Sequence, residues 1–393
     1  MGLDGIGVIG FFDLREADEF ISVRNLTVIA NEVRRCLWRD LQLIPDAMLD
    51  SMGYGGIALA DVENFTGYDN VIEDNGARNP APICGVFVLH AEGIDLCRNQ
   101  ILNNGRRAVA RQDNDPFGRR GGINIVFAVA PVLASDPVAN LTVSVVRVNF
   151  PEPTGRPAVR ILENIVSAPI GQALLMSALG PVSVLGNQLT SSGVARGARA
   201  ALLRPATVGI LNLGLSNELY FQLFLFALLH RQPQGALPGL DDARVGSLLA
   251  NGNVLFADNQ CSLDLLEPGS AAAYLSISIL SLDDVGFHDN QCDCNLGTGE
   301  DFVLSQAFLA GLSVRVTGNR FKEGILNAPF SAITFGWLNT TAHNQATHCL
   351  FVQGPPALMI NGPNTILIGA FFQRFCGDTM AATLANFAKL IKG

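Results

Sequence analysis

The sequence has few charged and few aromatic residues. Charged residues make up 16% of the 393 positions and aromatic residues 7%, with only 4 Tyr and 2 Trp. So little charge predicts that a large fraction of the chain is buried. The shortage of Tyr and Trp disfavours a long carbohydrate groove, because such a groove relies on aromatic rings for stacking. The 40 glycines favour a fold with many turns over a helical bundle.

Positive charge is also scarce. Lys and Arg together number 26 against 35 Asp and Glu, which gives a net charge of -9. This balance disfavours nucleic acid as a partner, because nonspecific binding needs a basic surface. One arginine-rich stretch stands out as a candidate ligand-binding site for a polyanion such as an acidic polysaccharide. The alternative is a solvated loop in which these arginines pair with Asp113 and Asp115. The arginines are Arg106, Arg107, Arg111, Arg119 and Arg120.

Targeting signals and cysteine motifs are missing as well. Met1 to Phe12 lacks the features of a secretory signal, and the longest apolar run, Leu219 to Leu229, is too short to span a bilayer. We therefore expect a cytoplasmic protein, or one exported without a signal peptide as part of an assembly. The eight cysteines are scattered, so we interpret most of them as small buried apolar residues. Cys292, Cys294 and His348 match no compact zinc motif, and we predict no metal site.

The sequence does contain a repeated phrase, apolar-x-apolar-x-x-Asn-x-apolar, in seven full copies. The first two apolar residues alternate as one face of a strand does, and the last begins another strand. The Asn between them marks a turn, since Asn tolerates the left-handed backbone of a bend and stacked amides can hydrogen-bond to one another. Counting degenerate copies, the predicted ladder consists of Asn31, Asn70, Asn99, Asn164, Asn187, Asn259, Asn290, Asn319, Asn344 and Asn364.

The spacing of these asparagines indicates a solenoid. Most gaps are 20 to 31 residues long, whereas the gaps after Asn99 and Asn187 are 65 and 72 residues. A unit this short cannot bury its apolar face alone, so the units must stack. Leucine-rich repeats need a Leu-rich unit of nearly constant length, which this chain lacks. We therefore predict an all-β, right-handed parallel β-helix. The two long gaps each look like two or three coils whose Asn has degenerated or whose loop has grown.

On this phrase the chain, from Leu26 to Ile368, resembles the right-handed parallel β-helix proteins of the pectate-lyase-like superfamily. The segments around Asn259, Asn290 and Asn344 look most like bacterial members of unassigned function, some associated with phage-tail-like assemblies. The resemblance implies the fold. Polygalacturonase-like members also carry Gly-His-Gly and Arg-x-Lys signatures after an Asp pair, and here only the pair Asp283-Asp284 is present.

We expect two parts in the chain. Residues 1–376 form the β-helix, with insertions near 37–55, 105–122 and 217–247. Residues 377–393 form an amphipathic helix that caps the open end or docks a partner, since Met380, Leu384 and Phe387 recur at helical spacing. The apolar run Leu219 to Leu229 and this helix are the expected surfaces for self-association or for another protein.

Two functions from different classes fit these features. The first is a noncatalytic scaffold or binding protein that works as an oligomeric component of a larger, phage-tail-like assembly, with no cofactor. The second is a polysaccharide lyase or glycoside hydrolase acting on an acidic polysaccharide. Its catalytic candidates are Asp283, Asp284 and His288, with calcium or a nearby Arg as helper.

Overall fold

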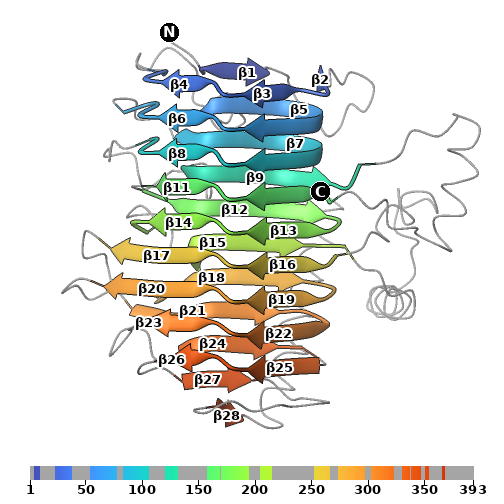
Figure 1. Ribbon diagram of the computed structural model, residues 1–393, viewed down its shortest axis with the longest axis vertical. Helices are drawn as coiled ribbons and strands as arrows, with labels where there is room; N and C mark the ends of the chain where they lie inside the picture. Colours follow the sequence, from blue (N-terminus) through green and yellow to red (C-terminus); the bar gives the residue numbers. More distant parts are fainter. Residues whose placement is uncertain are drawn as a thin grey trace, which may run out of the picture.

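The computed structural model describes residues 4–8, 23–37, 54–77, 83–105, 120–131, 157–168, 170–193, 204–214, 252–265, 273–296, 302–322, 330–336, 338–346, 350–353 and 365–367. Within these residues the chain is all-β and forms a right-handed parallel β-helix, as the phrase predicted (Figure 1). Its coils stack from β1 at one end to β28 at the other. The predicted C-terminal helix at 377–393 lies outside the described residues.

Each coil contributes strands to three faces of the solenoid. The first face carries the longest strands, and β5 and β7 bend from it directly into the second face. Its strands are β1 (Ile6–Val8), the first parts of β5 (Tyr54–Tyr68) and β7 (Ile83–Cys97), β9 (Gly121–Val129), β12 (Gln172–Leu179), β15 (Arg204–Asn212), β18 (Ala273–Ser281), β21 (Phe302–Ala310), β24 (Phe330–Phe335), β27 (Leu350–Gln353) and β28 (Thr365–Leu367).

The second and third faces meet at the turn that contains the repeated Asn. The second face consists of β2 (Val23–Arg24), β3 (Thr27–Ile29), the ends of β5 and β7, β10 (Val159–Leu162), β13 (Val182–Leu185), β16 (Val254–Ala257), β19 (Val285–His288), β22 (Ser313–Thr317) and β25 (Leu338–Ala342). The third consists of β4 (Glu32–Arg34), β6 (Val71–Glu73), β8 (Gln100–Leu102), β11 (Ile165–Ala168), β14 (Gln188–Ser191), β17 (Gln260–Leu265), β20 (Gln291–Leu296), β23 (Arg320–Lys322) and β26 (Gln345–Ala346).

The apolar positions of the phrase build the core. Equivalent residues of successive coils pair in register, so identical positions stack into columns that point inward. Phe256 and Phe287 stack with ring centroids 5.3 Å apart, and Phe287 lies 6.4 Å from Phe321. All three side chains are fully buried. Burying one such side chain contributes about 1.5–3 kcal/mol, so the columns supply the main stabilisation of the stack.

Asparagines on either side of each long gap are direct neighbours in the ladder. The backbone N–H of Asn99 donates directly to Oδ1 of Asn164, and that of Asn187 to Oδ1 of Asn259. Both extra segments, 132–156 and 215–251, interrupt the corner between the first and second faces. The prediction of two or three coils in each long gap is therefore wrong, because each gap adds a single coil to the stack.

The tight turn at each repeated Asn differs from the prediction in one detail. The left-handed backbone belongs to the residue before the Asn, such as Asp69 (φ 56°), Arg98 (φ 53°) or Gly186 (φ 67°). The Asn itself does not take a positive φ. Its role is confined to hydrogen bonding, because the preceding residue already reverses the chain direction.

The cysteines within the described residues are free thiols. Five of the six are buried and Cys36 is partly buried. Cys261 and Cys292 occupy the inward position that follows the Asn, in register with Leu189 and Phe321. Burial raises the pKa of both thiols. These side chains therefore act as small apolar residues of the core.

Candidate functional site

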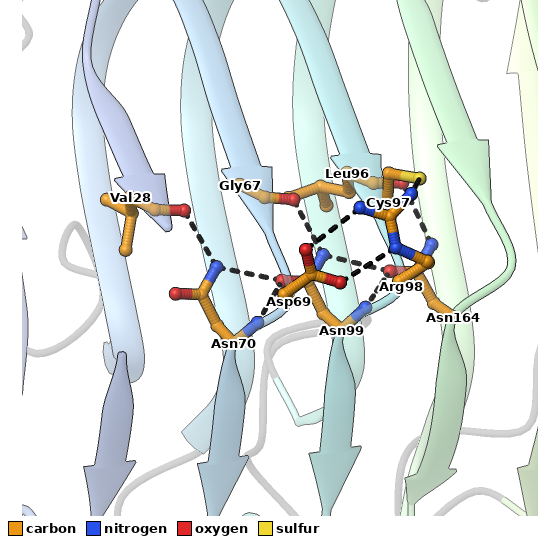
Figure 2. Close-up of polar contacts among 9 residues, drawn as sticks. All are labelled: Val28, Gly67, Asp69, Asn70, Leu96, Cys97, Arg98, Asn99 and Asn164. Atoms are coloured by element: carbon orange, nitrogen blue, oxygen red, sulfur yellow. Dashed lines mark hydrogen bonds and ion pairs between the residues drawn. The ribbon is translucent and has the colours of Figure 1, made fainter. Parts of the chain in front are cut away.

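The asparagine ladder is the most extensive polar structure of the described chain (Figure 2). For Asn99, the backbone N–H donates to Oδ1 of Asn164 at 2.9 Å. Its Nδ2 donates to the same oxygen at 2.9 Å and to the Gly67 carbonyl at 2.8 Å. Each internal amide thereby joins three coils. The same pattern connects Asn31, Asn70, Asn99, Asn164, Asn187, Asn259, Asn290, Asn319 and Asn344, and Asn364 lies outside the described residues.

A second, shorter ladder stands at the end of the third face. Asn75 donates through Nδ2 to Oδ1 of Asn104 at 2.9 Å and to the Val33 carbonyl. In the first coil the N–H of Cys36 completes it by donating to Asn75. We did not predict this ladder. The sequence pattern that could have predicted it is a second Asn five residues after the ladder Asn in two consecutive coils. Both ladders hold successive coils together.

A polar network lies on the outer surface of the second face, across three successive coils. Oδ2 of Asp95 accepts hydrogen bonds from the Tyr68 hydroxyl and from the Arg160 guanidinium. The hydrogen bond to Asp95 raises the pKa of Tyr68. Arg160 belongs to β10, the first described strand after residues 132–156. The network therefore fixes the strand with which the chain rejoins the solenoid.

Two further acid–base pairs flank this network. Arg98 and Asp69 form a two-pronged ion pair with both N–O distances at 2.8 Å, and the hydrogen bonds from Arg98 lower the pKa of Asp69. This pair is solvent-exposed, so it contributes little to stability. Nearer the first face, Nδ1 of His90 lies 2.6 Å from Oδ1 of Asp61. None of these residues was identified from the sequence, since the partners become neighbours only when the coils stack.

The structure separates the two adjacent aspartates Asp283 and Asp284. Asp283 is 3% exposed, and its Oδ2 accepts a hydrogen bond from the Gly252 N–H at 3.3 Å. Ser281 links the same two segments through its hydroxyl. Asp283 thus holds the corner at Gly252, where the described chain resumes after residue 251, and its carboxylate does not face solvent.

Asp284 contributes to a different site, which we call the Asp284 patch: Asp284, Gly286 and His288 of one coil with Arg315 and Thr317 of the next. The three residues on or next to β19 alternate with buried Val285 and Phe287, so they point outward. Register pairing sets Gly286 beside Arg315 and His288 beside Thr317. The His288 ring folds over Gly286, where an added Cβ would lie 2.7 Å from Nε2. Nδ1 of His288 lies 2.7 Å from the Thr317 hydroxyl.

The charges in this patch act on one another. Burial raises the pKa of Asp284, with a further increase from Asp283, while Arg315 opposes the shift. Burial lowers the pKa of His288, Asp289 opposes it, and Arg315 lowers it further. His288 is therefore a neutral imidazole at pH 7. A carboxyl group with a raised pKa and a neutral imidazole are groups that acid–base chemistry uses, and the charge of Arg315 acts on both.

The arginine-rich stretch is described only at its end. Arg120 is 5% exposed and donates from Nη1 to the Gly105 carbonyl at 2.9 Å. It therefore fastens the corner between the third and first faces and does not point at a ligand. Arg106, Arg107, Arg111 and Arg119 lie outside the described residues.

Within the part of the chain that the structure describes, no three His, Cys, Asp or Glu side chains converge in a way that could hold a metal ion. The same residues include no helix that is both long and apolar enough to cross a membrane. No family model, curated protein or solved structure matches the chain. Proposals about function therefore rest on the fold and on the side-chain geometry.

Proposed function

We propose that this chain is a noncatalytic β-helix scaffold that binds other molecules on its outer faces. The observation that carries the proposal is the asparagine ladder, which runs from Asn31 to Asn344. The Asn of the repeated phrase, which is the most frequent polar feature of the sequence, is used for hydrogen bonds between coils. Asp283 and Arg120, two of the residues with predicted chemical roles, hold corners of the same stack. Such a solenoid offers long, regular surfaces for binding.

The proposal includes self-association as part of a larger assembly. The surfaces that we propose for it are the apolar run Leu219 to Leu229 and the amphipathic segment 377–393, on the grounds of their sequence alone. Sedimentation of the purified protein at micromolar concentration tests this part, with a variant ending at residue 376 as comparison. A second variant, Phe221→Ser, changes the apolar run. We expect the wild type to form an oligomer, and we expect it to dissociate in whichever of the two variants removes the contact surface. A strict monomer would remove the oligomeric form of the proposal.

A second candidate function rests on the Asp284 patch. We propose it as an elimination site for an acidic polysaccharide. The Arg315 guanidinium would pair with a uronate carboxylate, and Nε2 of His288 would accept the proton from the adjacent ring carbon. Asp284 would donate its proton to the departing glycosidic oxygen, which leaves one unsaturated end and one reducing end. A proton passing from His288 to Asp284 resets the site. Calcium fits poorly here, since it needs several oxygen ligands and the patch offers one carboxyl group, which lies near the positive charge of Arg315.

The two functions are separated by assaying uronate polysaccharides for unsaturated products. Turnover that disappears in Asp284→Asn, but persists in Asp293→Asn on the third face, would establish the enzyme and refute the noncatalytic scaffold. The enzyme hypothesis predicts a rate that falls at high pH, where Asp284 loses its proton, and at low pH, where His288 gains one. Burial raises the pKa of Asp284 and lowers the pKa of His288, and both shifts enlarge the fraction of sites in the reactive state. No turnover on a broad panel favours the scaffold.

A further inference from the structure

The outer surface of the third face carries a regular array of uncharged polar side chains. In β14, β17 and β20 the residue directly after the ladder Asn is a glutamine, and the inward residue follows it. Register pairing sets these glutamines beside one another, and it aligns a second outward column two residues further on. We call this array the glutamine face; it consists of Gln188, Thr190, Gln260, Ser262, Gln291 and Asp293.

The glutamine side chains are available for binding. Gln188 and Gln260 are exposed and Gln291 is half-buried. Their backbone N–H groups are used, since each donates to the carbonyl of a ladder Asn in the preceding coil. Their side-chain amides, however, have no hydrogen-bond partner among the described residues, in contrast to the ladder asparagines next to them. The amides therefore present free donors and acceptors at intervals of about 4.8 Å.

The composition of the array determines which partner it suits. Amides and hydroxyls both donate and accept hydrogen bonds, so they match a ligand rich in hydroxyl groups. The six residues include one charge, Asp293, and no cation, and the cations Arg320 and Lys322 come only in the next coil, beside Gln291 and Asp293. Along its three coils the array therefore disfavours polyanions such as nucleic acid or uronate chains. They also include no large apolar side chain, which disfavours a buried protein interface.

We propose that the glutamine face binds a neutral polysaccharide lying along the axis of the solenoid. The three glutamine amides contact successive sugar hydroxyls, and Thr190 and Ser262 contact the neighbouring edge of the chain. With no aromatic ring among the six residues, single contacts are weak, and affinity comes from repetition along an extended ligand. The inference rests on the proposed binding function and names its ligand class and surface.

Affinity electrophoresis in gels containing hydroxyethyl cellulose or mixed-linkage β-glucan tests this proposal, with polygalacturonate as the charged comparison. We expect retardation by a neutral glucan and at least a tenfold weaker retardation for the triple variant Gln188→Ala, Gln260→Ala, Gln291→Ala. The matched control is Gln100→Ala, Gln345→Ala, which removes the same residue type from the same position outside the array. Its retardation should stay within twofold of the wild type. Unfolding followed by circular dichroism shows whether each variant keeps its fold.

Three results in the gels overturn the proposal. They are no retardation by any neutral glucan tested, equal loss in the triple variant and its control, and retardation by polygalacturonate alone. A change in sedimentation of the triple variant without loss of glucan binding assigns the face to contact between copies and also refutes it. Failure here is distinguishable from failure of the scaffold, because only turnover that depends on Asp284 refutes the scaffold.

Discussion

The ladder residue Asn187 offers the sharpest test of how the coils are held together. Its side chain is fully buried. Oδ1 accepts from the N–H and Nδ2 of Asn164, and Nδ2 donates to the Ile161 carbonyl and to Oδ1 of Asn259. Asn187→Ala leaves buried donors and an acceptor of the preceding coil without partners. Each unpaired buried group costs about 1–3 kcal/mol, so we expect a loss of about 3–6 kcal/mol in unfolding free energy.

The assay for this substitution combines urea unfolding with amide hydrogen exchange. Exchange should accelerate most at the backbone N–H of Asn164, which donates to Asn187 in the wild type. Gln188→Ala is the matched control, because the side chain lies next in sequence but points to solvent, and we expect a change within about 0.5 kcal/mol. A loss below about 1 kcal/mol for Asn187→Ala, or equal losses in both variants, would refute the reasoning.

Three other substitutions test separate parts of the account. Gly186→Ala places a Cβ on a residue with φ 67°, where its only close neighbour is the Glu163 side chain at 3.5 Å. Backbone strain should therefore lower the free energy of unfolding in urea by about 1 kcal/mol, and no change would contradict the turn geometry. Phe287→Ala removes a buried ring that stacks on Phe256 and lies beside Phe321 of the third face, and should cost about 3–5 kcal/mol in the same assay, whereas a loss below 1 kcal/mol would argue against this packing. Burial raises the pKa of Asp4 to about 6 although it accepts the Gly55 N–H, so the folded state holds its proton longer than the unfolded state and stability falls as pH rises from about 4 to 6. Asp4→Asn should therefore stabilise the protein by up to about 3 kcal/mol above pH 7 and leave it unchanged below pH 4, and a gain that is independent of pH would count against this cause.

The sequence was sufficient to predict the fold because the phrase combines two independent signals. Alternating apolar residues identify a strand, and the Asn identifies the corner that follows it. The chain could not reveal by itself that Asn187 and Asn259 are neighbours, since an enlarged loop and a lost coil leave the same gap. Hydrogen bonding between the two side chains decides the matter.

The candidate site was less predictable for a physical reason. Asp283 and Asp284 are adjacent in sequence, yet one is buried at a corner and the other faces outward, because successive residues point to opposite sides of the wall. The sequence does not reveal that the buried one meets the N–H of Gly252. Arg315 joins Asp284 only through the register of two coils. Similarly, Arg160 meets Asp95 across a loop whose length hides their proximity.

The central claim is that successive copies of the phrase form neighbouring coils even where a long loop separates them. Cross-linking by a short thiol reagent tests it most directly in the double variant Thr190→Cys, Ser262→Cys, whose positions pair in register across the loop 215–251. We predict efficient cross-linking, detected by mass spectrometry, and little for Thr190→Cys with Lys322→Cys, since Lys322 lies two coils beyond Ser262. Efficient linking of the second pair, or none of the first, would contradict the account.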